Sequence, residues 1–170
     1  LNFVYIMSQK KLIIDADTGS DDAVAILMAL RDPRVQVLGI TIVSGNVPLK
    51  QGIINTLSTA ELCDVEVKVF AGADKPLKRE YLEIYTLEEF QKHVHTLSPD
   101  SVTAQCVHGF DGMGDIGVEP KNKNYEEEDA VDYLINSFNK KSCPKVIPWE
   151  IAFVSSAVVS VVFLSFLASE

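Results

Sequence analysis

Short apolar runs alternate with helix-forming segments through the first 70 residues, and this alternation constrains the fold more than any other feature of the sequence. The segments 11–14, 35–43 and 65–70 have the length and side chains typical of strands, whereas 21–30 and 48–62 favour helices. Strand, helix, strand, helix, strand at this spacing predicts a parallel sheet that is covered by helices.

The loops that follow the three predicted strands are polar or contain glycine. They span residues 15–22, 44–46 and 71–74. In parallel sheets of this kind, ligands bind outside the carboxyl ends of the strands. We therefore expect these three loops to converge on one binding site.

Four carboxylates lie within eight residues, directly after the first predicted strand: Asp15, Asp17, Asp21 and Asp22. Crowded carboxylates repel one another, so a cluster of this kind typically holds a cation. The segment offers only oxygen ligands, with no neighbouring His or Cys, which favours Ca²⁺ or Mg²⁺ over zinc. The alternative is a solvated loop in which one aspartate caps the following helix.

The rest of the chain is less regular. Four glycines within ten residues predict a loop at 108–117. The amphipathic segment 130–138, with acidic residues before it, predicts a helix. We also expect a short helix at 87–94.

Composition and charge exclude several classes of protein. Hydrophobic residues make up 47% and charged residues 23% of the 170 residues, which is typical of a globular domain rather than a disordered chain. The net charge of −9 argues against binding nucleic acid through a basic surface. Cys63, Cys106 and Cys143 are far apart, which argues against a disulfide framework or a zinc site and favours a reducing, cytoplasmic location.

Four segments resemble, in the same order, motifs of the calcium-dependent nucleoside hydrolase family. They are Asp15-Ala16-Asp17-Thr18-Gly19-Ser20-Asp21-Asp22, Ile42-Val43-Ser44-Gly45-Asn46, Ala71-Gly72-Ala73-Asp74-Lys75-Pro76-Leu77 and His108-Gly109-Phe110-Asp111-Gly112-Met113-Gly114. The resemblance implies a family domain at 7–140. Its fold class would be α/β, with a Rossmann-like, open, mostly parallel sheet and helices on both faces.

The resemblance also implies hydrolysis of the N-glycosidic bond of a ribonucleoside to ribose and free base. By analogy with the family, Asp17 and Asp22 would bind Ca²⁺, and Asp17 would activate a calcium-bound water. Asp21 would bind the ribose hydroxyls, Asn46 would lie near the water and the sugar, and His108 would contact the ribose. The alternative for His108 is a histidine exposed on a loop. A nucleoside partner and a homo-oligomer are further implications.

Two other functions stay open. A strand followed by Asp15 and Asp17 partly matches the signature of haloacid dehalogenase-type phosphatases, although Gly19 stands where that signature has threonine. In the nucleoside hydrolase interpretation, Asp15 would instead support the site. The family motifs end near Asn139, and the later ones, which supply further calcium ligands and a leaving-group acid, are not recognisable. The second alternative is therefore an apparently truncated, non-catalytic fragment that binds ribose or a partner.

Both ends of the chain differ from the family pattern. We interpret Met7 as the start of the protein and residues 1–6 as upstream sequence. Residues 141–170 have no family motif, and 151–168 carry no charge. This tail is open to three interpretations: a translation artefact, a membrane anchor just long enough for a bilayer, or a buried element of the α/β core. A membrane is an expected partner only if the anchor forms.

Overall fold

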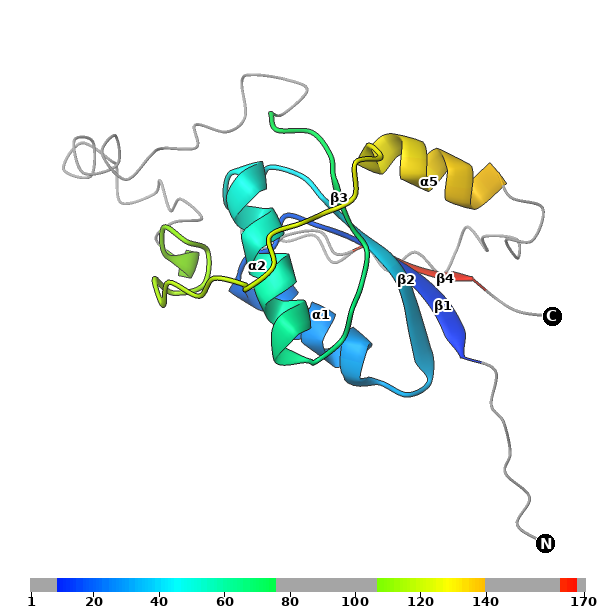
Figure 1. Ribbon diagram of the computed structural model, residues 1–170, viewed down its shortest axis with the longest axis horizontal. Helices are drawn as coiled ribbons and strands as arrows, with labels where there is room; N and C mark the ends of the chain where they lie inside the picture. The colour runs from blue at the N-terminus through cyan, green and yellow to red at the C-terminus, as the bar shows by residue number, and fades with distance from the viewer. Residues whose placement is uncertain (1–8, 76–106, 140–162, 168–170) are drawn as a thin grey trace, which may run out of the picture.

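The computed structural model describes residues 9–75, 107–139 and 163–167. The elements in chain order are β1 (Lys10–Ala16), α1 (Ser20–Arg31), β2 (Val35–Ile42), α2 (Leu49–Leu62), β3 (Val69–Ala71), α5 (Ala130–Asn139) and β4 (Phe163–Leu167). Figure 1 shows α1 and α2 on one side of the strands and α5 on the other. None of the helices in the described part of the chain has the length and apolarity that crossing a bilayer requires.

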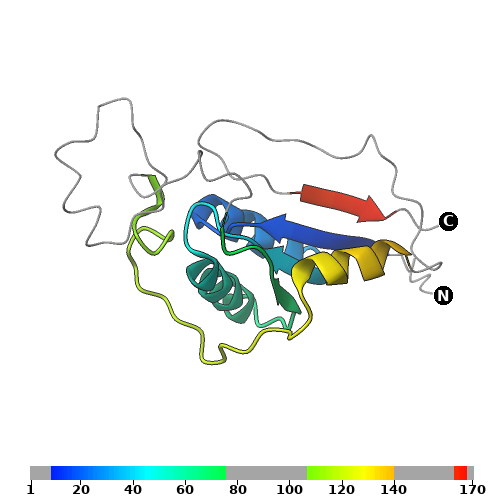
Figure 2. The ribbon, with the colours of Figure 1, turned by 90° about the horizontal axis from the view of Figure 1, so that it is seen from above.

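The described strands form one sheet in the order β3-β2-β1-β4. β2 pairs in parallel with β1 on one side and with β3 on the other, so that Ile40 lies between Ile14 and Val69. β4 pairs with β1 in the antiparallel sense, and the two arrows point in opposite directions in Figure 2. The predicted open, mostly parallel sheet is thus confirmed.

β4 belongs to the apolar tail. Its backbone pairs with β1 from Lys11↔Leu167 to Asp15↔Phe163 and extends the sheet at that edge. The rest of the tail, residues 1–8 and the helix expected at 87–94 lie outside the described residues.

One face of the sheet packs against α1 and α2 and forms the core. Alternate residues of each strand point to this face because the strands are pleated, and a register shift between Leu12 and Ile13 places Ile14 beside Ile40. The buried members of this core are Leu12, Ile14, Ala16, Ile26, Ile40, Ile42, Ile53 and Val69. Burying one large aliphatic side chain contributes roughly 1.5–3 kcal/mol, so the core holds the carboxyl ends of β1 and β2 firmly beside the first turn of α1.

The opposite face of the sheet is covered by α5. The rings of Phe70 and Tyr133 stack with their centroids 3.7 Å apart. Gly39 makes room for this stack, because a Cβ at this position would lie 2.6 Å from Tyr133 Oη and 2.8 Å from Phe70 Cε2. The expected helices on both faces are therefore present.

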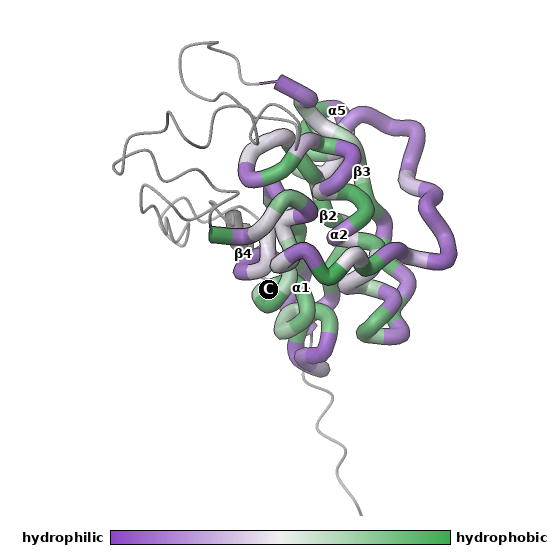
Figure 3. Tube along the Cα trace, turned by 90° about the vertical axis from the view of Figure 1, so that its left-hand side faces the viewer, coloured by the Kyte–Doolittle hydropathy of each residue, from purple (hydrophilic) through white to green (hydrophobic). Residues whose placement is uncertain are grey.

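A hydrophilic connection leads from the glycine-rich loop to α5. It runs along the outside of α2 (Figures 1 and 3). The backbone N–H of Lys121 donates to Glu61 of α2 over 2.8 Å, and the Lys121 ammonium also pairs with this carboxylate. This connection carries the chain from one face of the sheet to the other.

The third strand is shorter than predicted. The prediction covered 65–70, whereas β3 spans Val69–Ala71. The difference arises at the end of α2, where Asp64 takes a left-handed backbone conformation and the Val65 N–H donates to Ala60 O. The first residues of the predicted strand therefore terminate the helix instead of joining the sheet.

Candidate functional site

The predicted aspartate cluster lies where β1 passes into α1. Asp17 follows the last strand residue, and Asp21 and Asp22 occupy the first turn of the helix. The Asp22 carboxylate accepts a hydrogen bond from the Gly19 N–H over 3.4 Å, which caps the helix. The partial positive charge of a helix amino terminus stabilises carboxylates at this position. We call residues 15–22 the aspartate loop.

The loop after β2 contacts Asp17 directly. The backbone N–H of Asn46 donates to Asp17 Oδ2 over 2.5 Å. Gly45 allows this approach, because a Cβ on Gly45 would overlap the Asp17 carboxylate. Two of the three predicted loops therefore meet at one carboxylate.

Asp22 is the most crowded of the acidic residues. Its side chain is 1% exposed. Burial, followed by the charges of Asp17 and Asp21, raises the pKa of Asp22 to about 7. Within the described residues, Asp21 Oδ1 and Asp22 Oδ1 are buried and have no hydrogen-bond partner. Oxygens in this state fit a cation, which would relieve the repulsion and replace the missing donors.

The glycine-rich loop brings His108 to the same place. His108 is buried, with 5% of its surface exposed, and is not a histidine in open solvent. Its Nδ1 lies 2.8 Å from Ser20 Oγ and 3.9 Å from Asp21 Oδ1. Its Nε2 is buried without a hydrogen-bond partner among the described residues. His108 therefore lies against the first turn of α1 with one ring nitrogen left for another group.

Asp15 lies apart from this cluster. Its Oδ1 accepts a hydrogen bond of 2.5 Å from the Thr41 hydroxyl on the neighbouring strand. Burial, followed by the charge of Asp17, raises the pKa of Asp15, and the Thr41 hydrogen bond works in the opposite direction. Asp15 thus joins β1 to β2 beneath the aspartate loop.

Sequence reasoning missed a set of buried polar residues on α2. Thr56 Oγ1 lies 2.7 Å from Thr18 Oγ1, and the Asn55 amide donates to Thr18 O over 2.9 Å. Both α2 side chains are almost completely buried. Their signal in the sequence is a run of amide and hydroxyl side chains on the helix face that packs on the core.

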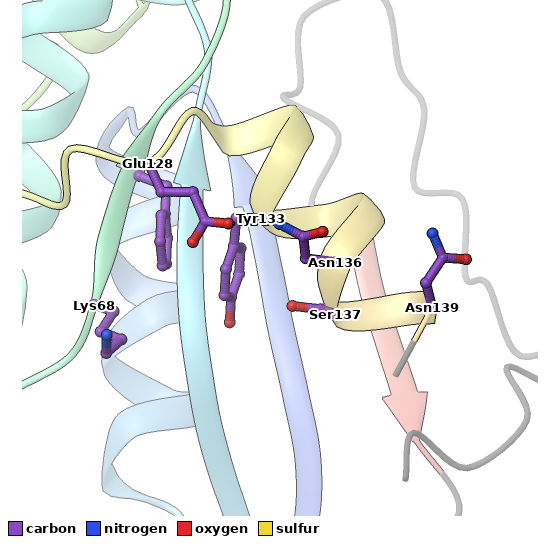
Figure 4. A pocket seen from close by; sticks show the side chains of 7 residues that line it. Lys68, Glu128, Tyr133, Asn136, Ser137 and Asn139 are labelled. Atoms are coloured by element: carbon purple, nitrogen blue, oxygen red, sulfur yellow. Dashed lines mark hydrogen bonds between the residues drawn. The ribbon is translucent and has the colours of Figure 1, made fainter. Parts of the chain in front are cut away.

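A separate cavity of about 530 Å³ lies on the α5 side of the sheet. Figure 4 shows its lining by Lys68, Phe70, Glu128, Tyr133, Asn136, Ser137 and Asn139. No residue of the aspartate loop contributes to it. In the described ranges, no three acidic, histidine or cysteine side chains group into a complete metal site. The described residues alone therefore do not form a metal site.

Comparison with known proteins assigns the family. Residues 12–156 match the family model described as inosine-uridine preferring nucleoside hydrolase. The chain belongs to the nucleoside hydrolase family. The matched residues include all three loops that form the candidate site and continue past residue 140, near which the sequence motifs end.

Individual nucleoside hydrolases agree with this assignment. The pyrimidine-specific ribonucleoside hydrolase RihB of Escherichia coli (strain SE11) is 33% identical over 131 residues, which cover 77% of this chain and 36% of the relative. The RihB protein of Escherichia fergusonii gives the same identity and coverage. The chain thus spans about a third of the length of these relatives.

Solved structures of nucleoside hydrolases share the fold. An inosine-guanosine nucleoside hydrolase is 31% identical with a TM-score of 0.57, and the similarity covers 76% of this chain and 35% of that one. A plant nucleoside hydrolase is 29% identical with a TM-score of 0.59, over 78% of this chain and 36% of the other. The names of these relatives cover both purine and pyrimidine nucleosides.

Proposed function

We propose that this chain carries the sugar-side half of a ribonucleoside hydrolase site, which cleaves the N-glycosidic bond to give ribose and free base. The observation that carries the proposal is the crowding of Asp22 against Asp17 and Asp21, with carboxylate oxygens that have no donor. Such an arrangement is costly for a fold unless a positive charge balances it. Family membership provides the reaction class.

Calcium is the cation that we propose for this cluster. Asp17 and Asp22 would hold it, because their carboxylates are adjacent and Asp22 has a buried oxygen without a partner. Oxygen-only ligands favour Ca²⁺ or Mg²⁺ over transition metals. When bound, Ca²⁺ supplies a lowered pKa for a coordinated water and a fixed orientation for the ribose hydroxyls.

The side chains have distinct proposed roles in the reaction. Asp17 takes a proton from the attacking water, whose oxygen forms a bond to the anomeric carbon while the bond to the base breaks. The electron pair of the broken bond leaves with the base, which takes a proton from solvent to give the free base. Asp21 accepts hydrogen bonds from ribose hydroxyls, and Asn46 orients the water and the sugar. The partnerless Nε2 of His108 is available to the bound ribose.

The carboxylates also act through their charge. The sugar becomes positively charged in the transition state, so fixed negative charges beside it lower the barrier. Asp17 and Asp22 would hold a metal whose positive charge would offset part of the repulsion among the carboxylates. The same crowding thus serves both metal binding and transition-state stabilisation.

A second candidate is binding of ribose or a partner without hydrolysis. It is favoured because, within the described residues, no three acidic, histidine or cysteine side chains group into a metal site. Calcium affinity follows ligand number, so this candidate predicts weak binding and no turnover.

The phosphatase alternative is not retained, because the family match accounts for the aspartate motif and Asp15 is engaged by Thr41.

A cytoplasmic location also remains our proposal. The free thiol of the buried Cys63 is consistent with a reducing compartment.

Calcium titration by calorimetry on the full chain tests the proposal, followed by ribose release from inosine and from uridine. The Asp17→Ala/Asp22→Ala double variant is the comparison. Binding that is lost in the double variant, with ribose release that is lost as well, supports hydrolysis. Calcium binding without ribose release favours the second candidate. Ribose release that survives the double variant would overturn the mechanism.

A further inference from the structure

Asn55 connects two of the three loops that form the candidate site. Its Nδ2 donates to Thr18 O over 2.9 Å and to Asp111 O over 2.7 Å, and its Oδ1 accepts from Gln51 Nε2 over 3.0 Å. Thr18 follows Asp17 in the aspartate loop, whereas Asp111 belongs to the glycine-rich loop that carries His108. One amide group therefore bonds two segments that lie more than 90 residues apart in the sequence.

The burial of Asn55 gives this connection its strength. The side chain is 2% exposed, so water has little access to the two carbonyl oxygens that it binds. A buried carbonyl that loses its donor costs more free energy than an exposed one. Both partners are acceptors, so only a side chain with two N–H donors at this point satisfies them together.

The two loops have a further link at their other end. Ser20 Oγ and His108 Nδ1 form a hydrogen bond, and Thr56 of α2 holds the Thr18 hydroxyl. Asn55 differs from these residues because it alone among them bonds both loops at once, from a rigid helix.

We propose that Asn55 is a positioning residue, which fixes the distance between the aspartate loop and the glycine-rich loop and so holds His108 against the carboxylates. Asn55 itself does not touch the reacting atoms. The effect of Asn55 on the reaction rests on the proposed function. The hydrogen bonds from Asn55 to the two loops are present whether or not that function is correct.

Hydrogen–deuterium exchange on the full chain tests the link. Asn55→Asp keeps the size of the side chain and removes both donors. The matched control is Thr59→Val, which removes a buried hydrogen bond of 2.8 Å to Asn55 O within the same helix and touches neither loop. We expect Asn55→Asp to raise exchange at 16–20 and 107–117 by roughly tenfold or more, with no change in β2. Thr59→Val should leave both loops unchanged.

Calcium affinity supplies a second measurement. Asn55→Asp should weaken binding by about tenfold, because displaced ligands coordinate poorly, and Thr59→Val should have little effect. If the unchanged protein binds no calcium, the proposed function fails, and the exchange experiment still decides on Asn55. If Asn55→Asp does not fold, Asn55→Ser, which retains one donor, should show an intermediate rise confined to the loops. A rise spread evenly over the sheet, or none in the loops, would overturn the inference.

Discussion

The backbone N–H of Asn46 donates to the Asp17 carboxylate over 2.5 Å, although 29 residues separate them in the sequence. The two residues follow neighbouring parallel strands, and the pairing of Ala16 with Ile42 brings the strand ends together. A hydrogen bond from a backbone N–H holds the carboxylate in one orientation. The orientation of the Asp17 carboxylate thus depends on the loop after β2 as well as on the aspartate loop.

Gly45→Ala should abolish calcium binding while the protein stays folded. The added methyl would overlap the Asp17 carboxylate and force it away from Asn46. Calorimetry measures the binding, and circular dichroism checks the fold. Ser44→Ala is the matched control, because it lies in the same loop and removes a buried hydroxyl that has no hydrogen-bond partner among the described residues. Equal calcium affinity in Gly45→Ala and the unchanged protein would show that Asp17 is not a ligand.

Asp22→Asn should stabilise the metal-free protein and remove its response to calcium. The neutral amide still accepts from the Gly19 N–H, and it no longer repels Asp17 and Asp21. Because the folded protein raises the pKa of Asp22 to about 7, ionising this group at neutral pH costs folding free energy. We expect a gain on the order of 2 kcal/mol in urea unfolding with EDTA.

Glu66→Gln is the control for that measurement, because it removes one negative charge from an exposed side chain. It should change the unfolding free energy by less than about 0.5 kcal/mol. Added calcium should stabilise the unchanged protein and Glu66→Gln, but not Asp22→Asn. A lower stability of Asp22→Asn in EDTA would contradict the interpretation of Asp22 as a repelled carboxylate.

Gly39→Ala should destabilise the fold without a direct effect on the aspartate loop. The added methyl meets the stacked rings of Phe70 and Tyr133. Overpacking of this kind typically costs about 1–3 kcal/mol. Urea unfolding measures the loss, and Tyr133→Ala supplies the matched background, because it removes the nearest ring. If Gly39→Ala costs as much in that background as in the unchanged protein, the clash with Tyr133 is not its cause.

The glycine-rich loop should lose order at low pH because of Asp111. Partial burial works to raise the pKa of Asp111, but the N–H groups of Gly117, Met113 and Asp115 outweigh it and lower the pKa below the ordinary value of 3.8. Since the folded pKa is depressed, the stabilisation is present above about pH 4 and is lost as the pH falls through the folded value.

Amide chemical shifts of Met113 and Gly117, followed by NMR as the pH is lowered, measure this transition. We expect midpoints below 3.8, the ordinary aspartate value, and no matching transition in Asp111→Asn. Midpoints at or above that value would contradict the role of Asp111 in holding the loop.

The sequence predicted the order of β1, α1, β2, α2 and α5 because each shows a clear periodicity and a defined end. The parallel sheet followed from this order, as did the meeting of Asp17 with the loop of Asn46. The family motifs pointed to His108, but not to its burial or its hydrogen bond with Ser20. Ser20 and His108 are 88 positions apart in the sequence, so no local pattern predicts their contact.

The link that Asn55 makes between the aspartate loop and the glycine-rich loop was not predicted, for a similar reason. An asparagine in a helix usually faces water, and only the positions of both loops show that Asn55 lies beneath them. The end of α2 also misled the strand prediction, because the alternation of Val65 to Lys68 looks like a strand while the Val65 N–H belongs to the helix terminus. The local periodicity of hydrophobic residues predicts neither long-range contacts nor the point at which a helix ends.

The separations between partners in this site imply an order of assembly during folding. Asp17 meets Asn46 across 29 residues, Thr18 meets Asn55 across 37, and Ser20 meets His108 across 88. The entropy lost on closing a loop grows with its length, so the first two contacts form with the βαβ unit and the last forms later. A nascent chain that ends before the glycine-rich loop could already bring Asp17 and Asn46 together, whereas His108 would reach Ser20 only after that loop has been made.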